Sequence, residues 1–492
     1  MDEKILQFGE GNFLRAFVDY FVDELNGLGF FNGSVVVVQP IARGMAETLN
    51  AQECRYTVLL RGLLNKQPTV VKREVSCISR AINPYERFND FLGAARNPHL
   101  RYIVSNTTEA GITFVGTDRL TDKPPSSFPA KVTSLLYERF KFCRGDKSKG
   151  FVFIPCELVD DNGSRLKEMV SRYARLWQMP QGFIEWLRDA NHFTNTLVDR
   201  IVTGFPKDET DQISAIEAEN GYRDELVVAG EIFHFFAIEA SPEIRKEISE
   251  AMPFHEAGLN VMLTDDVAPY KLRKVRILNG GHTMSVLAAY LSGIDTVLDM
   301  MNDPLFTKYL RKGIYSEVMP TLDGKLPQDE LDTFAESVFE RFANPYLKHY
   351  LLDISLNSVS KYRARVLPTV LEFNKEFSKL PPLLTLSFAA LSAFYKGTEN
   401  EDGAFVGERD GEPYVIKDDP DILTYFKNEW GKVSSGENDL SAFVRNLCKK
   451  VDFWGEDLTS LSGFCEQATA YLKSIVTYGM RATLENILGE YT

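Results

Sequence analysis

The first forty residues of the 492-residue chain carry the feature that most restricts its fold. Lys4 to Phe8 is a short apolar run, Asn12 to Leu25 places apolar residues at helical spacing, and Ser34 to Pro40 contains four consecutive valines. A valine run of this kind is typical of a parallel strand that is buried on both faces. The helical spacing between the two runs supplies the crossover that parallel strands need. The segment therefore predicts a βαβ unit and a parallel sheet with helices on its faces.

The pattern of the chain changes after about residue 205. Before it, the segments 102–105 and 151–154 predict further buried strands, with helices expected over 84–95 and 131–142. From Tyr270 onward long helical patterns dominate, and the charged segment 397–411 predicts an exposed loop or hairpin. We therefore expect an α/β chain with a parallel-sheet domain over 1–235 and a mostly α-helical domain over 236–492.

Composition excludes several classes of protein. The chain has 55 Lys and Arg against 69 Asp and Glu, and its net charge of −14 argues against a nucleic-acid-binding protein. No apolar run reaches the roughly 18 residues that a membrane helix needs, and the charged start has no apolar core of a signal peptide. The six cysteines form no C-x-x-C pair, so free thiols in the reducing cytoplasm are expected.

A glycine-containing turn follows the first predicted strand. Gly9 can make the tight turn into the helix, and Gly11 lets a pyrophosphate approach the backbone at the helix N-terminus. The fingerprint is partial, because Leu14 replaces the third glycine and Gln39, not an acidic residue, closes the second strand. Its spacing alone fits equally well a tight turn that binds nothing. Its position in the first βαβ unit favours a phosphate-binding role.

The segment 271–282 is the most informative in the chain. Lys274, Asn279 and His282 are polar groups in or beside a largely apolar helical pattern. A lysine can act as the base that oxidises an alcohol if burial and nearby cations such as Arg273 and Arg276 lower its pKa. An asparagine can donate a hydrogen bond to the developing oxyanion, and a histidine can hold a substrate hydroxyl. Purely structural roles for the same three residues remain an alternative.

A catalytic metal is the competing way to activate an alcohol. Zinc requires three or four His, Cys or carboxylate ligands in a recognisable grouping. The six histidines are dispersed through the sequence, and none has a cysteine within ten residues. We therefore expect no metal site.

Together these segments resemble the mannitol dehydrogenase family of polyol-specific long-chain dehydrogenases. The K-x4-N-x2-H signature of the family is matched by Lys274, Asn279 and His282, and its N-terminal pattern is matched by residues 8–16. Further stretches are similar to a hexuronate-specific branch of the family and lie at residues 105–111, 154–158, 196–204 and 341–346. The likeness extends over nearly the whole chain.

The resemblance implies a Rossmann-like NAD-binding domain, a helical substrate and catalytic domain, and a site in the cleft between them. It implies NAD as cofactor, no metal, and interconversion of D-tagaturonate and D-altronate in hexuronate catabolism. Lys274 would be the general acid/base, Asn279 the oxyanion donor and His282 the substrate-orienting residue. The implied cofactor-binding residues are Phe8, Gly9, Gly11, Asn12, Phe13, Arg15, Asn106, Glu109 and Asp199.

Two departures from the family pattern concern the substrate. A second oxyanion asparagine is replaced by Leu158, so this donor is missing or is supplied by another residue such as Asn162. The substrate-binding arginine of the mannitol branch falls near Lys361, with Arg363 and Arg365 close behind. Because the chain is acidic overall, local cations must bind an anionic substrate, and these three side chains are the candidates.

Other functions remain open. Fructuronate reductase and polyol or polyol-phosphate dehydrogenases belong to the same family, and a dinucleotide-binding regulator without catalysis is an alternative of a different class. The intact Lys274, Asn279 and His282 set disfavours the regulator. The expected partner is a small hexuronate or aldonate, with neither nucleic acid nor membrane. Arg43, after the second strand, could meet the 2′-phosphate of NADP, and the sequence specifies no oligomeric state.

Overall fold

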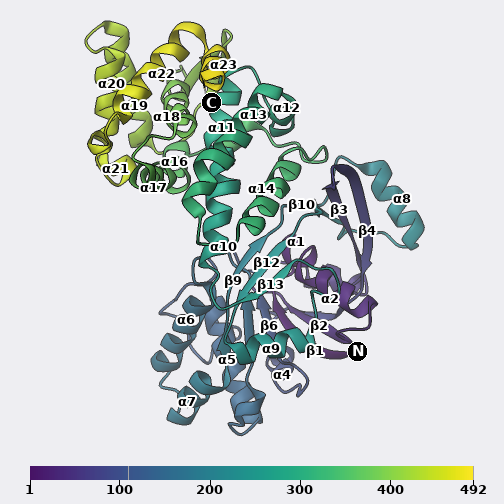
Figure 1. The fold of residues 1–492 in the computed structure, drawn as a ribbon. Coiled ribbons are helices and arrows are strands. Elements are labelled where there is room, and N and C mark those ends of the chain that lie inside the picture. Colours follow the sequence, from purple (N-terminus) through teal and green to yellow (C-terminus); the bar gives the residue numbers. More distant parts are fainter. Residues whose placement is uncertain (109, 491–492) are drawn as a thin grey trace. The chain divides into compact units, whose positions relative to one another are not determined.

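The protein, seen in a computed structural model, is described over residues 1–108 and 110–490. It forms two compact units, Met1–Ala268 and Pro269–Thr492 (Figure 1). This division comes later than the 235/236 boundary expected from the sequence.

Three strands explain the later boundary. Strand β12 (Phe235–Glu239) pairs antiparallel with β9 (Asn195–Asp199) and parallel with β13 (Val261–Thr264). Backbone hydrogen bonds thus tie the segment after residue 235 to the first unit. The sequence pattern missed β12 and β13 because both are short and lie between polar segments.

The main sheet of the first unit has six parallel strands in the order β5-β2-β1-β6-β7-β8. Strands β2 and β5 lie on one side of β1, and β6, β7 and β8 lie on the other, so the strand order changes direction between β1 and β6. Ligands of α/β sheets bind at such a switch point. The α/β fold with a Rossmann-like sheet, expected from the sequence, is confirmed. The strands are β1 (Asp2–Phe8), β2 (Gly33–Val38), β5 (Ile78–Ile82), β6 (Tyr102–Ser105), β7 (Val152–Pro155) and β8 (His192–Phe193).

Alternate residues of these strands point to opposite faces of the sheet, as a β-strand requires. Ile5 and Val37 belong to the core that also contains Phe21 of α2. Leu6 and Val38 belong to a second core that the helices α4 to α7 cover. Both faces are therefore buried, which explains the uninterrupted valine run. The helices of this unit are α1 (Asn12–Arg15), α2 (Val18–Gly27), α3 (Ala46–Ala51), α4 (Phe88–Ala94), α5 (Phe128–Phe142), α6 (Asn162–Leu176), α7 (Gln181–Ala190), α8 (Thr210–Asn220) and α9 (Pro242–Ala251).

A hairpin inserted between β2 and β5 forms a second sheet. Its strands β3 and β4 pair antiparallel, and the sheet order is β10-β11-β3-β4. Figure 1 shows the long hairpin beside α8. The strands are β3 (Tyr56–Leu64), β4 (Gln67–Val75), β10 (Val202–Gly204) and β11 (Val228–Glu231).

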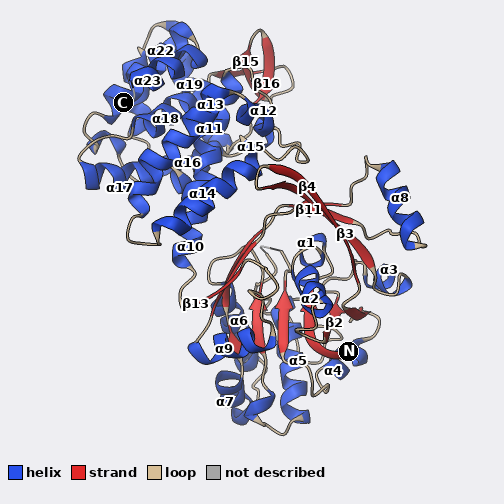
Figure 2. Cartoon of the chain, turned by 45° about the vertical axis from the view of Figure 1, so that its right-hand side comes forward, coloured by secondary structure: helices blue, strands red, loops and turns tan. Residues whose placement is uncertain are grey.

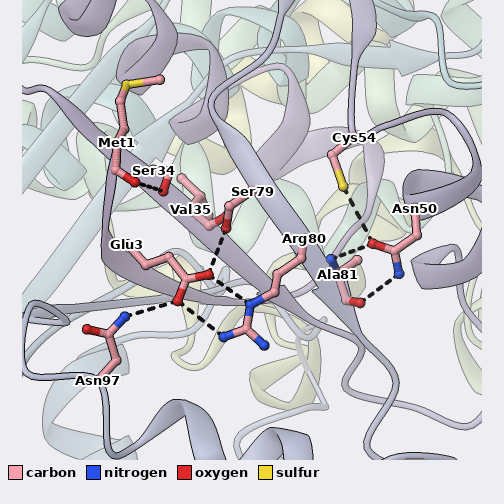
Figure 3. A network of polar contacts seen from close by, with 10 residues as sticks. All are labelled: Met1, Glu3, Ser34, Val35, Asn50, Cys54, Ser79, Arg80, Ala81 and Asn97. Carbon is pink, nitrogen blue, oxygen red and sulfur yellow. Dashed lines mark hydrogen bonds and ion pairs between the residues drawn. The ribbon is translucent and has the colours of Figure 1, made fainter.

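Polar side-chain contacts connect the outer strand β5 to β1 and to α3 (Figure 3). The Glu3 carboxylate on β1 accepts hydrogen bonds from Arg80 Nε at 2.8 Å and Asn97 Nδ2 at 3.0 Å. Asn50 of α3 forms two hydrogen bonds with the backbone of Ala81, at 2.8 and 2.9 Å. These bonds tie β5 to the start of β1 and to α3.

The first helix differs from the single helix expected over 12–25. It breaks after Arg15, and α2 starts at Val18. Two distant side chains satisfy the carbonyls that the break leaves without helical partners. Tyr56 Oη donates to Arg15 O at 3.1 Å, and Arg200 Nη1 donates to Ala16 O at 2.6 Å. Tertiary contacts therefore override the helical pattern of the sequence.

The second unit is mostly helical, as expected. Its central helices α11 and α18 are buried along nearly their whole length, which explains their apolar composition. Segment 397–411 belongs to a small antiparallel meander, β14 (Gly397–Glu399), β15 (Phe405–Arg409) and β16 (Glu412–Val415), whose last two strands are labelled in Figure 2. The helices are α10 (Ala268–Arg273), α11 (Gly280–Leu291), α12 (Val297–Asn302), α13 (Pro304–Gly313), α14 (Gln328–Phe342), α15 (Leu351–Ile354), α16 (Ser358–Arg365), α17 (Leu367–Phe377), α18 (Pro382–Phe394), α19 (Pro420–Ser435), α20 (Leu440–Cys448), α21 (Val451–Trp454), α22 (Phe464–Tyr478) and α23 (Met480–Glu490).

Across residues 1–108 and 110–490, no helix has both the length and the apolar character that crossing a membrane demands.

Candidate functional site

The glycine turn lies at the switch point of the main sheet. Gly9 has a φ of +121°, which side-chain-bearing residues rarely adopt. A Cβ at Gly9 would lie 2.7 Å from the carbonyl oxygen of Asn106, at the end of β6. Backbone hydrogen bonds join Gly9 N to Val38 O and Asn106 N to Phe8 O, both at 3.0 Å. Gly9 is thus required by the close approach of the two strand ends.

Gly11 lies in a different environment. It is the residue before α1, its φ of −67° suits any residue, and no heavy atom lies within 4 Å of a Cβ built on it. The space over Gly11 is therefore open and could receive a phosphate group against the backbone. Because α1 has only four residues, its dipole adds little, contrary to the long helix that the sequence predicted.

Arg15 holds the glycine turn from inside the protein. Its buried guanidinium donates from Nε to Glu10 O at 3.1 Å, from Nη2 to Asn12 Oδ1 at 2.7 Å, and from Nη1 to Leu226 O. Burial lowers the pKa of Arg15. Through these contacts Arg15 supports the turn from inside the protein.

The remaining predicted cofactor residues divide into supporting and accessible groups. Phe8 is fully buried, and its ring packs against those of Phe91 and Phe128. Phe13 stacks on Phe17, with ring centroids 4.9 Å apart. Asp199 is buried at the end of β9. Asn106 is half-buried, and its Nδ2 donates to Cys156 O at 2.7 Å. Glu109 lies outside the described residues.

Asn162, the candidate for the second oxyanion donor, forms hydrogen bonds within the protein. Its buried Nδ2 donates to Pro155 O at 3.1 Å and to Thr196 Oγ1 at 3.0 Å, and its Oδ1 accepts from Thr196 N at 2.9 Å. These bonds use both amide hydrogens for structure. The neighbouring Leu158 side chain is 64% exposed and has no donor to offer.

Glu157 is a buried acid that the sequence analysis did not single out. Its carboxylate accepts from Ser105 Oγ at 3.0 Å and from Thr107 N and Oγ1 at 3.1 and 3.0 Å. Burial raises the pKa of Glu157. Glu157 thus connects the carboxyl ends of β6 and β7. Its position directly after a buried strand was the signal in the sequence that could have marked it as a site residue.

In the second unit, Lys274 and Asn279 bracket a π-helical turn. This turn, η2 (Lys274–Asn279), connects α10 to α11 without a break, so one continuous helix carries Lys274, Asn279 and His282. All three side chains are half-buried. A π-helical turn widens the helix and changes the direction of its side chains, and such turns often occur at functional sites.

The arginines beside Lys274 are engaged elsewhere. Arg273 lies 3.7 Å from the Glu330 carboxylate and stacks over Phe334. Arg276 donates to Thr369 Oγ1 at 2.6 Å and to Glu372 Oε1 at 3.2 Å. Each arginine thus pairs with a glutamate of its own.

His282 lies in an enclosed and positively charged environment. Its ring stacks on Phe342 and lies edge-on to His349, with centroids 6.2 Å apart. Its Nε2 is buried and has no hydrogen-bond partner among the described residues. Burial lowers the pKa of His282 well below its usual range, and nearby positive charges lower it further. Those charges belong to His349, Arg341, Arg365 and Lys361.

The three predicted substrate-binding cations do not lie together. Lys361 and Arg365 are four residues apart on α16 and share a helix face. Arg363 is exposed, and its guanidinium lies by the carbonyl of Asp452, at 3.4 Å, and by Gly455. The structure therefore keeps Lys361 and Arg365 as one pair and separates Arg363 from it. Arg341, buried at the end of α14, is the cation near His282 that the sequence analysis missed as a site residue.

Over the described part of the chain, no three His, Cys, Asp or Glu side chains gather in an arrangement that could hold a metal ion.

Comparison with known proteins assigns the chain to a family. The mannitol dehydrogenase Rossmann domain matches residues 3–249, and the mannitol dehydrogenase C-terminal domain matches residues 266–476. The altronate oxidoreductase of Yersinia enterocolitica is 44% identical over 98% of this chain and 96% of its own. That of Klebsiella pneumoniae is 45% identical over 97% and 95%.

Solved structures share the fold. Pseudomonas fluorescens mannitol 2-dehydrogenase, in a ternary complex with NAD and D-mannitol, matches with a TM-score of 0.65 at 21% identity, over 100% of this chain and 95% of that one. A substrate-free D-sorbitol dehydrogenase matches with a TM-score of 0.77 at 22% identity, over 98% and 95%. With both family domains matched over nearly the whole chain, the protein belongs to the mannitol dehydrogenase family.

Proposed function

We propose that the protein is an NAD-dependent oxidoreductase that interconverts D-tagaturonate and D-altronate in hexuronate catabolism. The observation that carries this proposal is the full-length identity of about 44% to relatives named altronate oxidoreductase. The residues that such a reaction needs, Lys274, Asn279 and His282, are all present and lie on one continuous helix.

The glycine turn fits a dinucleotide. The open backbone over Gly11 is a cradle that a side chain would fill, and Gly9 brings this backbone against the end of β6. Gly9, Gly11 and Asn106 would hold the cofactor, with Phe8, Phe13 and Arg15 supporting the turn, and Asp199 and Glu109 complete the proposed set. When bound, the nicotinamide supplies or takes the hydride.

The chain itself manages the proton and the charge. Lys274 is the proposed general acid/base, which protonates the oxygen of the reduced ketone and removes that proton in the reverse direction. Asn279 donates a hydrogen bond to the same oxygen as its charge develops. His282 donates to a substrate oxygen from a neutral ring. The amide of Asn162 donates to Pro155 and Thr196. In this proposal Asn279 is therefore the one asparagine that donates to the substrate oxygen.

An absorbance assay of NADH oxidation with D-tagaturonate tests the proposal. We expect turnover with tagaturonate, slower turnover with fructuronate, and little with fructose. Oxidation of mannitol by NAD should be weak in the same comparison. Turnover faster with fructuronate or mannitol would assign another substrate of the family, and failure with all four would contradict the enzyme. Repeating the assay with NADPH tests the proposed preference for NAD and the role of exposed Arg43.

A further inference from the structure

Three fully buried polar side chains hold the glycine turn from within the first unit: Gln7 of β1, Asp19 of α2 and Tyr56 of β3. Gln7 Nε2 donates to Gly9 O and to Asp19 Oδ2, both at 3.1 Å. Tyr56 Oη lies 3.1 Å from Arg15 O and 3.3 Å from Asp19 Oδ2. One carboxyl oxygen thus connects the two side chains that bind the carbonyls at the start of the glycine turn and at the end of α1.

The hydroxyl of Tyr56 has more acceptors within reach than it has hydrogens to donate. A phenol has one hydrogen, and both Arg15 O and Asp19 Oδ2 lie at hydrogen-bond distance from it. An ionised carboxylate is the stronger acceptor, because charge-assisted hydrogen bonds are roughly twice as strong as neutral ones. Ionised Asp19 therefore draws the hydrogen away from Arg15 O. Protonated Asp19 leaves it there, because its own hydrogen can be donated to the phenol oxygen.

The surroundings of Asp19 allow both charge states near neutral pH. Burial raises the pKa of Asp19 to about 7, and the charge of Asp23 on the same helix also raises it, whereas Arg15 lowers it. The thiols of Cys54 and Cys77 stay neutral in this range, because burial raises the pKa of both. Oδ1 of Asp19 has no hydrogen-bond partner among the described residues, so the ionised form is incompletely compensated.

We propose that Asp19 is a positioning residue for the cofactor, which through Gln7 and Tyr56 sets the shape of the backbone that receives the pyrophosphate. This inference rests on the proposed function and deepens it, because it links a proton to the binding of the dinucleotide. The protonated form keeps both carbonyl bonds. The ionised form loosens the end of α1 and places a negative charge behind a backbone that binds an anion.

The direction of the pH dependence follows from this arrangement. NADH carries a negative pyrophosphate, so its binding favours the neutral form of Asp19, and the carboxylate takes up a proton from solvent as NADH binds. By reciprocity, protonation of Asp19 increases the affinity for NADH. The Kd for NADH is therefore lowest below the pKa of Asp19 and rises as pH increases through it.

A purely structural role for the network is the competing explanation. Buried hydrogen bonds stabilise a fold whether or not they shape a binding site. That role predicts variants with lower melting temperatures whose folded fraction binds NADH as wild type does. The Kd for NADH and its change with pH, measured beside the melting temperature, therefore separate the two explanations.

The test compares Asp19→Asn, Asp19→Ala and Tyr56→Phe with wild type in the full-length protein. The Kd for NADH is measured by its fluorescence at pH 6, 7 and 8, kcat is measured at saturating NADH, and melting temperatures are recorded for every variant. Asp19→Asn keeps the size of the side chain and removes its titration. Asp19→Ala removes its hydrogen bonds as well.

Two further variants serve as matched controls. Asp23→Asn changes a buried carboxyl of the same helix, which binds Arg73 Nε at 2.7 Å and Ser76 N at 2.8 Å. Tyr102→Phe removes a buried hydroxyl at the start of β6, where it hydrogen-bonds to Glu247. Both should lose stability and keep the wild-type Kd for NADH at pH 6.

We expect the wild-type Kd for NADH to rise about fivefold between pH 6 and pH 8, as it does if binding raises the pKa of Asp19 by about one unit. Asp19→Asn should keep the wild-type value of pH 6 throughout, because its neutral amide oxygen accepts from Gln7 without drawing the phenol hydrogen. Asp19→Ala and Tyr56→Phe lose a hydrogen bond that supports the turn and should raise Kd about tenfold at pH 6. Their kcat at saturating NADH should stay within about threefold of wild type.

Three results would overturn the positioning role. These are a wild-type Kd that does not change with pH, an Asp19→Asn profile as steep as that of wild type, and wild-type binding of NADH by Tyr56→Phe. If Asp19→Ala does not fold, Asp19→Asn and Tyr56→Phe still decide, because each removes a single feature of the network and keeps the volume of the side chain.

Failure of the proposed function would look different. If wild type binds NADH but does not reduce tagaturonate, the substrate assignment fails, and the series of Kd values still tests the role of Asp19. If wild type binds NADPH in place of NADH, the same series is measured with NADPH, which carries the same pyrophosphate. Normal turnover in wild type together with unchanged Kd values in the variants would overturn the positioning role alone. Binding of neither dinucleotide would overturn both.

Discussion

The imidazole of His282 lies flat on the ring of Phe342, with ring centroids 3.9 Å apart and planes 7° apart. This stack fixes the plane of the histidine and hence the direction in which its unpartnered Nε2 points. Phe342→Leu keeps most of the apolar volume and removes the flat face. We expect kcat/KM for tagaturonate to fall about tenfold, with about 1 kcal/mol of stability lost.

Phe339→Leu is the matched control for that variant. It removes a buried ring from the same helix, where Phe339 packs near Tyr315 with centroids 6.1 Å apart. It should lower stability by a similar amount and leave kcat/KM within about twofold. Steady-state kinetics and thermal unfolding check both. Equal loss of activity in the two variants would show that the stack has no particular role.

Lys274→Ala tests the proposed acid/base. Removing a general acid/base lowers turnover by roughly a hundredfold to ten-thousandfold, and we expect a loss in this range. Binding of NADH, followed by its fluorescence, should survive because the glycine turn belongs to the other unit. Lys375→Ala controls for loss of one exposed lysine. If turnover of Lys274→Ala stays within about tenfold of wild type, another group transfers the proton.

Gly9 and Gly11 should respond in opposite ways to the same substitution. Gly9→Ala places a Cβ 2.7 Å from Asn106 O in a backbone conformation of positive φ, so we expect a marked fall in melting temperature. Gly11→Ala meets nothing within 4 Å, so stability should stay near wild type. Its methyl group would occupy the space proposed for pyrophosphate, so the Kd for NADH should rise at least tenfold. Wild-type NADH binding by Gly11→Ala would remove the glycine turn from the cofactor site.

Much of the first unit was predictable because its signals are local. The valine run of β2, the strand Lys4–Phe8 and the glycines between them identify a βαβ unit without knowledge of the rest of the chain. The break between α1 and α2 was not predictable, because it depends on hydrogen bonds from Tyr56 and Arg200, which come from distant parts of the sequence.

The candidate site was predictable in its residue types and less so in its geometry. Lys274, Asn279 and His282 stand out as polar residues in an apolar helix, but nothing in the sequence indicates the π-helical turn that connects them. The separation of Arg363 from Arg365 could have been inferred from helical spacing. The approach of Arg341 to His282 could not, since it comes from the packing of α14.

Gly280 and Gly281 provide a further pair of contrasting substitutions. Gly280→Ala presses against Arg365 O at 3.2 Å and should shift α16 relative to α11, so we expect kcat/KM to fall severalfold or more. Gly281→Ala makes ordinary contacts of 3.5 Å with Ile314 and Leu310, and alanine favours a helix by up to about 1 kcal/mol. It should therefore keep its activity and unfold at the same or a higher temperature. Equal kinetics in the two variants would contradict the close approach of α16 to Gly280.

Asp19 should make the stability of the protein depend on pH near neutrality. Burial raises the pKa of this fully buried carboxyl on α2 to about 7, while hydrogen bonds from Gln7 Nε2 at 3.1 Å and Tyr56 Oη at 3.3 Å oppose the shift. The native state then holds a proton that the unfolded state releases near pH 4. The stabilisation from this group is thus fully present below about pH 4 and is lost as pH rises to about 7.

Asp19→Asn removes this titration and keeps an oxygen that accepts from Gln7 and Tyr56. We therefore expect the free energy of unfolding to fall less steeply between pH 5 and 7 in the variant than in wild type, since about 1.4 kcal/mol is at stake for each unit of pKa difference. Denaturant unfolding at pH 5, 6, 7 and 8 measures the slope. Glu47→Gln, which removes an exposed carboxyl on α3, controls for net charge. Parallel curves for wild type and Asp19→Asn would show that Asp19 is ionised throughout this range, and the buried partner of its charge would then have to be Arg15, which acts on Asp19 electrostatically.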